Sequence, residues 1–69
     1  AEIWRVNGRK EGMGGLYADL YDSYSNEKVE YLDLYDKPEV YLNRIGRFYM
    51  WITKGIRVTN WNVTVEEYK

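Results

Sequence analysis

The sequence has no cysteine and no histidine among its 69 residues, and it also lacks glutamine. Without cysteine no disulfide can stabilise the fold, and without either residue the usual ligands of a structural zinc site are missing. The same two absences remove the commonest nucleophiles and proton-transfer groups of enzymes. We therefore expect a non-catalytic protein with no metal and no cofactor, and the lack of cysteine fits a reducing, cytoplasmic location.

Long apolar runs are missing as well. The longest run, FYMWI at residues 48–52, is far too short to span a bilayer, and no secretory leader pattern is present. A chain of 69 residues predicts a single domain, residues 1–69, which buries only about 60% of the surface that its unfolded chain exposes. Eight tyrosines, three tryptophans and one phenylalanine can supply a small core and leave some aromatic rings for the surface.

The net charge of −1 conceals a segregation of charge along the chain. Residues 17–39 carry seven acidic and two basic side chains, whereas residues 40–69 carry five basic and two acidic ones. This division has two interpretations. The acidic and basic segments pair with each other inside the fold, or one of them attracts a charged partner.

The first 15 residues predict a strand followed by a loop. Residues 2–6, EIWRV, alternate apolar and polar side chains as a half-buried strand does. Residues 7–15, NGRKEGMGG, contain four glycines, which predict a loop or a loose hairpin opened by the turn-forming pair Asn7-Gly8. This glycine-rich segment matches neither of the common phosphate-binding glycine patterns, so we expect no nucleotide site there.

A doubled phrase, YADLYD at residues 17–22 and YLDLYD at residues 31–36, predicts a β-hairpin. Two registers would place the leucines on one face and the tyrosines on the other. One register sets Asp19 opposite Asp33, which is unfavourable because like charges then face each other. The other sets Tyr17 opposite Asp33 and Asp19 opposite Tyr31, and it avoids that clash. A shift of the strand register by one residue would move the leucines of one strand to the tyrosine side of the hairpin.

Residues 36–55, DKPEVYLNRIGRFYMWITKG, predict a helix capped by Asp36, with Pro38 in its first turn and Gly55 after its last. Helical spacing places six apolar side chains on one face: Tyr41, Leu42, Ile45, Phe48, Tyr49 and Ile52. Gly46 in the middle and the run RFYMWIT leave an alternative open, in which the second half is a strand turning at Lys54-Gly55.

Residues 56–67 predict a final strand because they are rich in valine and threonine. Their alternation changes phase near Asn60, and a β-bulge at Thr59 to Asn60 would bring all the apolar residues, Ile56, Val58, Trp61, Val63 and Val65, to the core side. The expected fold is therefore α+β: a small antiparallel sheet, order β-β-β-α-β, with one helix packed on one face.

Two surfaces are candidates for a binding function. The acidic, tyrosine-rich sheet face combines flat rings with carboxylates, which suits a basic protein partner. Its residues are Tyr17, Asp19, Tyr21, Tyr31, Asp33 and Tyr35. The predicted helix offers basic groups around an exposed indole, which suits nucleic acid or self-association as a homodimer. Its residues are Arg44, Arg47, Trp51, Lys54 and Arg57.

Our leading hypothesis is a small regulatory protein that binds another protein through the tyrosine-rich face. An inhibitor encoded by a virus or a mobile element is one form of it. The alternative is a nucleic-acid-binding protein that uses the basic helix face.

Overall fold

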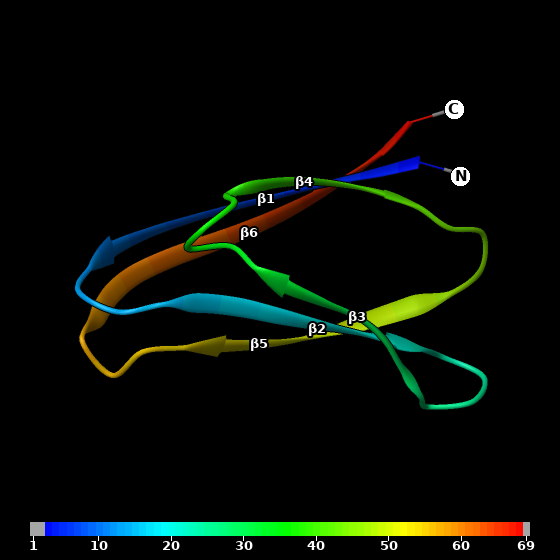
Figure 1. The fold of residues 1–69 in the computed structure, drawn as a ribbon, viewed down its shortest axis with the longest axis horizontal. Coiled ribbons are helices and arrows are strands. Elements are labelled where there is room, and N and C mark those ends of the chain that lie inside the picture. The colour runs from blue at the N-terminus through cyan, green and yellow to red at the C-terminus, as the bar shows by residue number, and fades with distance from the viewer. Residues whose placement is uncertain (1–2, 69) are drawn as a thin grey trace.

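The computed structural model describes residues 3–68, and every regular element in that range is a β-strand (Figure 1). The strands form two antiparallel three-stranded sheets, in the orders β4-β1-β6 and β3-β2-β5. The expected α+β fold is therefore wrong, and the protein is all-β. The strands are β1 (Ile3–Gly12), β2 (Leu16–Asp22), β3 (Lys28–Asp33), β4 (Glu39–Asn43), β5 (Phe48–Lys54) and β6 (Val58–Tyr68).

The two sheets lie one above the other as two layers, with the core between them (Figure 1). Alternate residues of β2 are buried, as expected of strands that pack one face on another layer. The buried cluster contains Val6, Leu16, Ala18, Leu20, Leu32, Leu34 and Leu42. Within residues 3–68 there is no helix long and apolar enough to cross a membrane.

The predicted hairpin is confirmed as β2 and β3, and its register is one of the two expected. Tyr17 lies opposite Asp33 and Asp19 lies opposite Tyr31, so the two aspartates do not face each other. The register shifts between Leu20 and Tyr21, where a bulge occurs. Leucines point to the core and tyrosines point away from it, as the alternation predicted.

The first strand continues through the pair that the sequence marked as a turn. β1 extends to Gly12, whereas the prediction ended the strand at Val6 and made residues 7–15 a loop or a loose hairpin turning at Asn7-Gly8. β1 is the central strand of its sheet, and Asn7 pairs with Glu39 on one side and Thr64 on the other. Two ladders of hydrogen bonds therefore override the local turn preference of Asn7-Gly8. The predicted strand also included Glu2, which lies outside the described residues.

The predicted helix over residues 36–55 is wrong. This segment forms β4, a loop at residues 44–47 and β5. Gly46 in the loop has a φ of 141°, which is incompatible with a helix. The alternative that gave the second half to a strand is correct for β5, where Phe48, Met50 and Ile52 pack against the core. The turn that follows β3 is capped by Asp33, whose carboxylate accepts hydrogen bonds from two backbone amides.

The predicted bulge in the last strand is confirmed. Gly12 pairs with Val58 and Glu11 pairs with Asn60, so Thr59 is the extra residue. Val58 is buried as a result, although Ile56 is 96% exposed in the turn before β6 and does not join the core.

Candidate functional site

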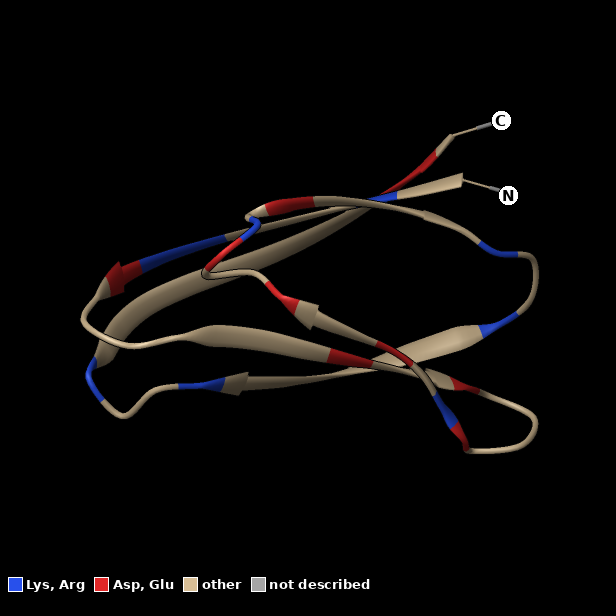
Figure 2. Ribbon diagram, viewed as in Figure 1, with Lys and Arg blue, Asp and Glu red and all other residues tan. Residues whose placement is uncertain are grey.

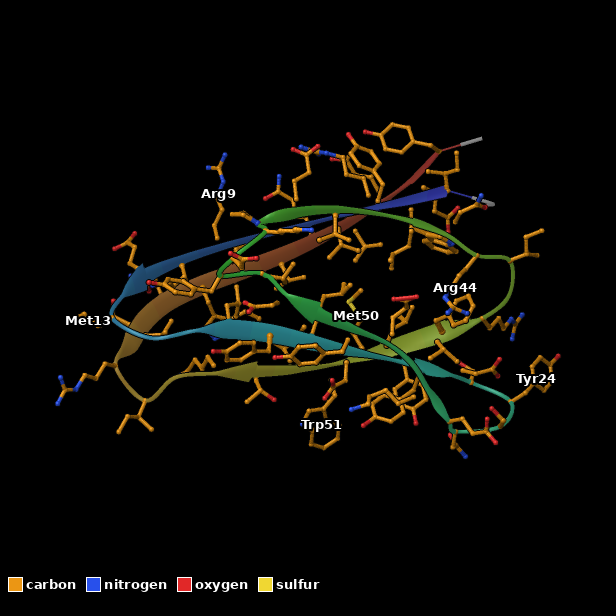
Figure 3. The ribbon with its side chains drawn as sticks, viewed as in Figure 1. Arg9, Met13, Tyr24, Arg44, Met50 and Trp51 are labelled. Carbon is orange, nitrogen blue, oxygen red and sulfur yellow. The ribbon has the colours of Figure 1, made fainter. Side chains whose placement is uncertain are left out.

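The outer surface of the β3-β2-β5 sheet gathers aromatic side chains from all three strands. β5 pairs with β2 so that Trp51 lies opposite Asp19 and Tyr49 lies opposite Tyr21. Figure 3 shows Trp51 directed away from the ribbon, whereas Met50 points between the two layers. We call this surface the aromatic face, and it consists of Tyr17, Asp19, Tyr21, Tyr31, Asp33, Tyr49 and Trp51.

The tyrosines of the aromatic face are stacked in pairs. The rings of Tyr17 and Tyr31 are 6.1 Å apart and nearly parallel, at 16°. The rings of Tyr21 and Tyr49 are 5.2 Å apart, at 9°. Such pairs restrict ring motion before anything binds, because each ring supports its neighbour. Trp51 has no such companion among the described residues, and 66% of it is exposed.

The charged groups of the aromatic face are mainly acidic. Asp19 has one basic neighbour at the edge, Lys28, whose Nζ lies 3.8 Å from Oδ1. Lys28 also lies over the ring of Tyr31, 5.9 Å from its centre. Desolvation raises the pKa of Tyr31 above its ordinary value, and the nearby carboxylate of Asp33 adds to this. The Tyr31 hydroxyl thus lies near two carboxylates, Asp33 and Asp19, both of which act to raise its pKa.

One predicted member does not belong to the aromatic face. Tyr35 lies in the turn after β3, and the ammonium of Lys10 from β1 is 4.7 Å from its ring centre. The structure thus brings together five of the six predicted residues. Tyr49 was missed, because it was assigned to the buried stripe of a helix. The strict alternation of Phe48, Met50 and Ile52 with Tyr49 and Trp51 could have placed it correctly.

The residues of the predicted basic helix face are not gathered on one surface. Arg44 and Arg47 belong to the β4–β5 loop at one end of the molecule, and Lys54 and Arg57 lie at the β5–β6 turn at the other end (Figures 1 and 2). β5 runs from one pair to the other and ends at Lys54, so its seven residues keep the two pairs about 20 Å apart.

Two of these basic groups are also engaged within the chain. Arg44 donates Nη2 hydrogen bonds to the carbonyl of Val29 at 2.9 Å and to Glu30 at 3.0 Å. Lys54 donates to the carbonyl of Val58 at 3.4 Å. Nucleic-acid binding stays a prediction, but it has lost the continuous basic face on which it depended.

The outer surface of the β4-β1-β6 sheet has a different character. Arg5 forms ion pairs with Glu39 at 3.0 Å and with Glu66 at 3.2 Å. The hydroxyl of Tyr41 donates to Glu39 and that of Tyr68 donates to Glu66. The hydrogen bonds from Arg5 and then Tyr41 hold the pKa of Glu39 below its usual range. We call this surface the polar face, and it consists of Arg5, Glu39, Tyr41, Glu66 and Tyr68. Its two tyrosines are therefore held by hydrogen bonds to glutamates of the same chain.

No group of three or more metal-binding side chains occurs in the part of the chain that the structure describes. Searches with this chain against protein-family models, curated protein sequences and solved structures each found no match.

Proposed function

We propose that this chain is a non-catalytic binding protein whose aromatic face docks onto a basic surface of another protein. The observation that carries the proposal is the exposure of Trp51 among ordered tyrosine pairs and carboxylates. A large indole ring left in water has an unfavourable solvation free energy, which a partner that covers it would remove. The lack of cysteine supports a cytoplasmic location for this binding.

Aromatic side chains of this kind dominate the binding energy of protein interfaces. Tyrosine and tryptophan contribute large contact areas and have only two side-chain torsions to immobilise. The stacking of Tyr17 on Tyr31 and of Tyr21 on Tyr49 reduces that entropy cost further, because the rings are already restrained. The two tyrosines of the polar face are restrained as well, since their rings are 6.4 Å apart and their hydroxyls donate hydrogen bonds to glutamates. A partner that used those hydroxyls would have to replace hydrogen bonds that the chain already makes, and among the described residues that face has no exposed tryptophan.

The charges of the aromatic face select a cationic partner. An arginine or lysine from the partner could place its cation over a ring and pair with Asp19 or Asp33. The chain already shows this geometry internally, because Lys28 lies over Tyr31 and close to Asp19. An inhibitor that covers the basic site of another protein would use the same contacts.

The first experiment compares two double variants, each of which removes two aromatic rings from one of the two outer faces. Trp51→Ala with Tyr31→Ala removes exposed rings from the aromatic face, and Tyr41→Ala with Tyr68→Ala removes two rings from the polar face. Each protein is used to capture partners from a lysate of the source cell, and the affinity of the purified partner is then measured by calorimetry. We expect the first variant to bind about thirtyfold more weakly and the second to bind as the unaltered protein does.

Equal binding by the unaltered protein and by the Trp51→Ala, Tyr31→Ala variant would disprove the role of the aromatic face. A third double variant, Asp19→Asn with Asp33→Asn, tests the contribution of the two carboxylate charges on the aromatic face. Asparagine can still accept the two turn hydrogen bonds of Asp33, so the fold should be retained. We expect slower association and a weaker dependence on salt, and an unchanged salt dependence would contradict the assignment of a basic partner.

A further inference from the structure

The free edge of β6 is the least protected strand edge in the described part of the chain. β6 is the longest strand and pairs with β1 on one side only. An edge strand presents unpaired backbone N–H and C=O groups, which proteins usually protect with lysine, proline, a bulge or a short length. From Asn60 to Tyr68 the strand has no lysine, no proline and no bulge, because its single bulge lies at Thr59, and its only charged residues, Glu66 and Glu67, lie near its end.

The other edge strands carry some of these protections. The guanidinium of Arg44 covers a carbonyl at the start of β3, at Val29. β4 has only five residues and follows Pro38. β5 has seven residues and ends in Lys54. β6 therefore stands out among the four edges in both length and chemistry.

The inner side of β6 is also incompletely covered. Val65 lies opposite Val6 of the core, so Val65 and the residues two and four positions before it, Val63 and Trp61, point toward the inner layer. Even so, Trp61 and Val65 are each 46% exposed. A cavity of about 310 Å³ between the two sheets is lined mainly by apolar side chains, and β6 contributes only Val65 to it, beside residues such as Leu42 of β4 and Met50 of β5. One chain alone thus leaves the β6 side of its core open.

We propose that two copies of this chain pair through their β6 strands, antiparallel, with Val63 of one copy opposite Val63 of the other. The result is a continuous six-stranded sheet, in the order β4-β1-β6-β6-β1-β4. Directly opposite residues of antiparallel strands point to the same side of a sheet. The inner sides of both β6 strands therefore meet, and both β3-β2-β5 sheets lie on that same side.

This register matches apolar residues with apolar ones and leaves no like charges opposed. Trp61 faces Val65 of the second copy on the inner side, an aromatic and β-branched pair that stabilises sheets. On the outer side Asn60 faces Glu66. A register centred on Thr64 would instead place Trp61 opposite the carboxylate of Glu67. Such self-complementarity indicates a second copy as the occupant of this edge.

The dimer does not depend on the proposed function, because β6 and the aromatic face belong to different sheets. Its test uses two double variants on the outer side of β6, where Asn62 of one copy faces Thr64 of the other. In the Asn62→Glu, Thr64→Glu variant, a glutamate of one copy faces a glutamate of the other copy at both of these symmetry-related contacts. Asn62→Glu with Thr64→Lys opposes a glutamate to a lysine at the same two places. Both positions are exposed in the monomer, and Asn62 lies opposite Arg9, which favours a glutamate there.

Sedimentation equilibrium measures the dissociation constant of the dimer, and circular dichroism verifies that each variant is folded. We expect the unaltered protein to be a dimer at micromolar concentration. The Asn62→Glu, Thr64→Glu variant should raise the dissociation constant at least tenfold, and the Asn62→Glu, Thr64→Lys variant should keep it near the unaltered value.

Three results would overturn the proposal. A monomeric unaltered protein excludes the dimer, and a dimer that neither variant affects must use another surface. Dissociation of both folded variants rules out the pairing about Val63. In the register about Thr64, both variants set like charges against each other, because Asn62 would then face Glu66 and Thr64 would face itself.

Discussion

Replacing Gly8 by alanine should destabilise the fold, although alanine normally suits a strand better than glycine does. Gly8 is in the middle of β1, on the side that faces the core. A Cβ atom added there would lie 2.8 Å from Cδ1 and 3.0 Å from Cβ of Leu34, and 3.1 Å from Cδ2 of Leu16. The side chain of Leu34, the first residue after β3, therefore occupies the space that a Cβ atom at position 8 would need.

The size of the effect depends on whether Leu34 can move away. Its Cδ1 atom can rotate, but its Cβ atom is fixed by the backbone, and the amide of Leu34 donates a hydrogen bond to the carbonyl of Leu16 at 2.9 Å. Overpacking of this kind costs about 1–3 kcal/mol. The gain in strand propensity offsets about 0.5–1 kcal/mol of that cost. The middles of these two ranges predict that the Gly8→Ala variant loses about 1 kcal/mol of unfolding free energy.

Urea unfolding followed by tryptophan fluorescence measures this loss as a lower midpoint at an unchanged slope. A double-mutant cycle with Leu34→Ala isolates the contact. The truncation alone should cost about 2–5 kcal/mol, and the two changes together should cost less than their sum by about 1 kcal/mol. An unfolding free energy for Gly8→Ala equal to or above that of the unaltered protein would refute the close packing of Leu34 on β1.

Three further changes test other parts of the structure. Trp4→Phe removes the hydrogen bond from the indole to the carbonyl of Arg44 at 2.8 Å and should cost about 1 kcal/mol in urea unfolding, so an unchanged midpoint would contradict that bond. Gly12→Ala places a side chain at a φ of 90° against the carbonyl oxygen of Arg57 and should cost about 1–3 kcal/mol in thermal unfolding, whereas an unchanged stability would disprove the close pairing of Gly12 with Val58 at the bulge. Spectrophotometric titration should show that Tyr31→Phe removes a tyrosine with a pKa above the ordinary value of about 10. The Tyr31 hydroxyl then stabilises the folded state below pH about 10, and this contribution is lost as the pH rises through its raised pKa. If the tyrosine that Tyr31→Phe removes titrates at the ordinary pKa instead, the raised pKa of Tyr31 and its predicted effect on stability are both wrong.

The hairpin and the bulge could be predicted because the residues that decide them are close in sequence. The two copies of the doubled phrase are 14 positions apart, and their leucines must share a face for either strand to be buried. The change of phase between Val58 and Trp61 likewise requires only one extra residue between them, which is a β-bulge. In both cases the hydrophobic pattern alone restricts the geometry to a few arrangements.

The helix was predicted wrongly because the pattern of apolar residues there fits two periods. Positions 41, 45, 48 and 52 suit a helical stripe, yet Phe48, Met50 and Ile52 also suit a strand. The pairing that decides between them is distant in sequence, since β4 pairs with β1 and β5 pairs with β2. The same holds for Asn7-Gly8, whose neighbours in the sheet, Glu39 and Thr64, come much later in the chain. Local propensity cannot report such contacts.

The change from helix to strand also relocates Trp51 and so alters the choice between the two candidate functions. In a helix, the spacing of Trp51 from Arg47 and Lys54 would have placed it among basic groups. In the structure Arg47 lies in the loop before β5 and Lys54 ends β5, so the two are at opposite ends of the strand, and Trp51 is turned to the outer side, opposite Asp19. The indole therefore belongs with carboxylates and tyrosines. A cation held between Trp51 and Asp19 would satisfy both groups at once, whereas a phosphate placed there would be repelled by the carboxylate. That electrostatic difference favours a basic protein over nucleic acid as the partner of the aromatic face.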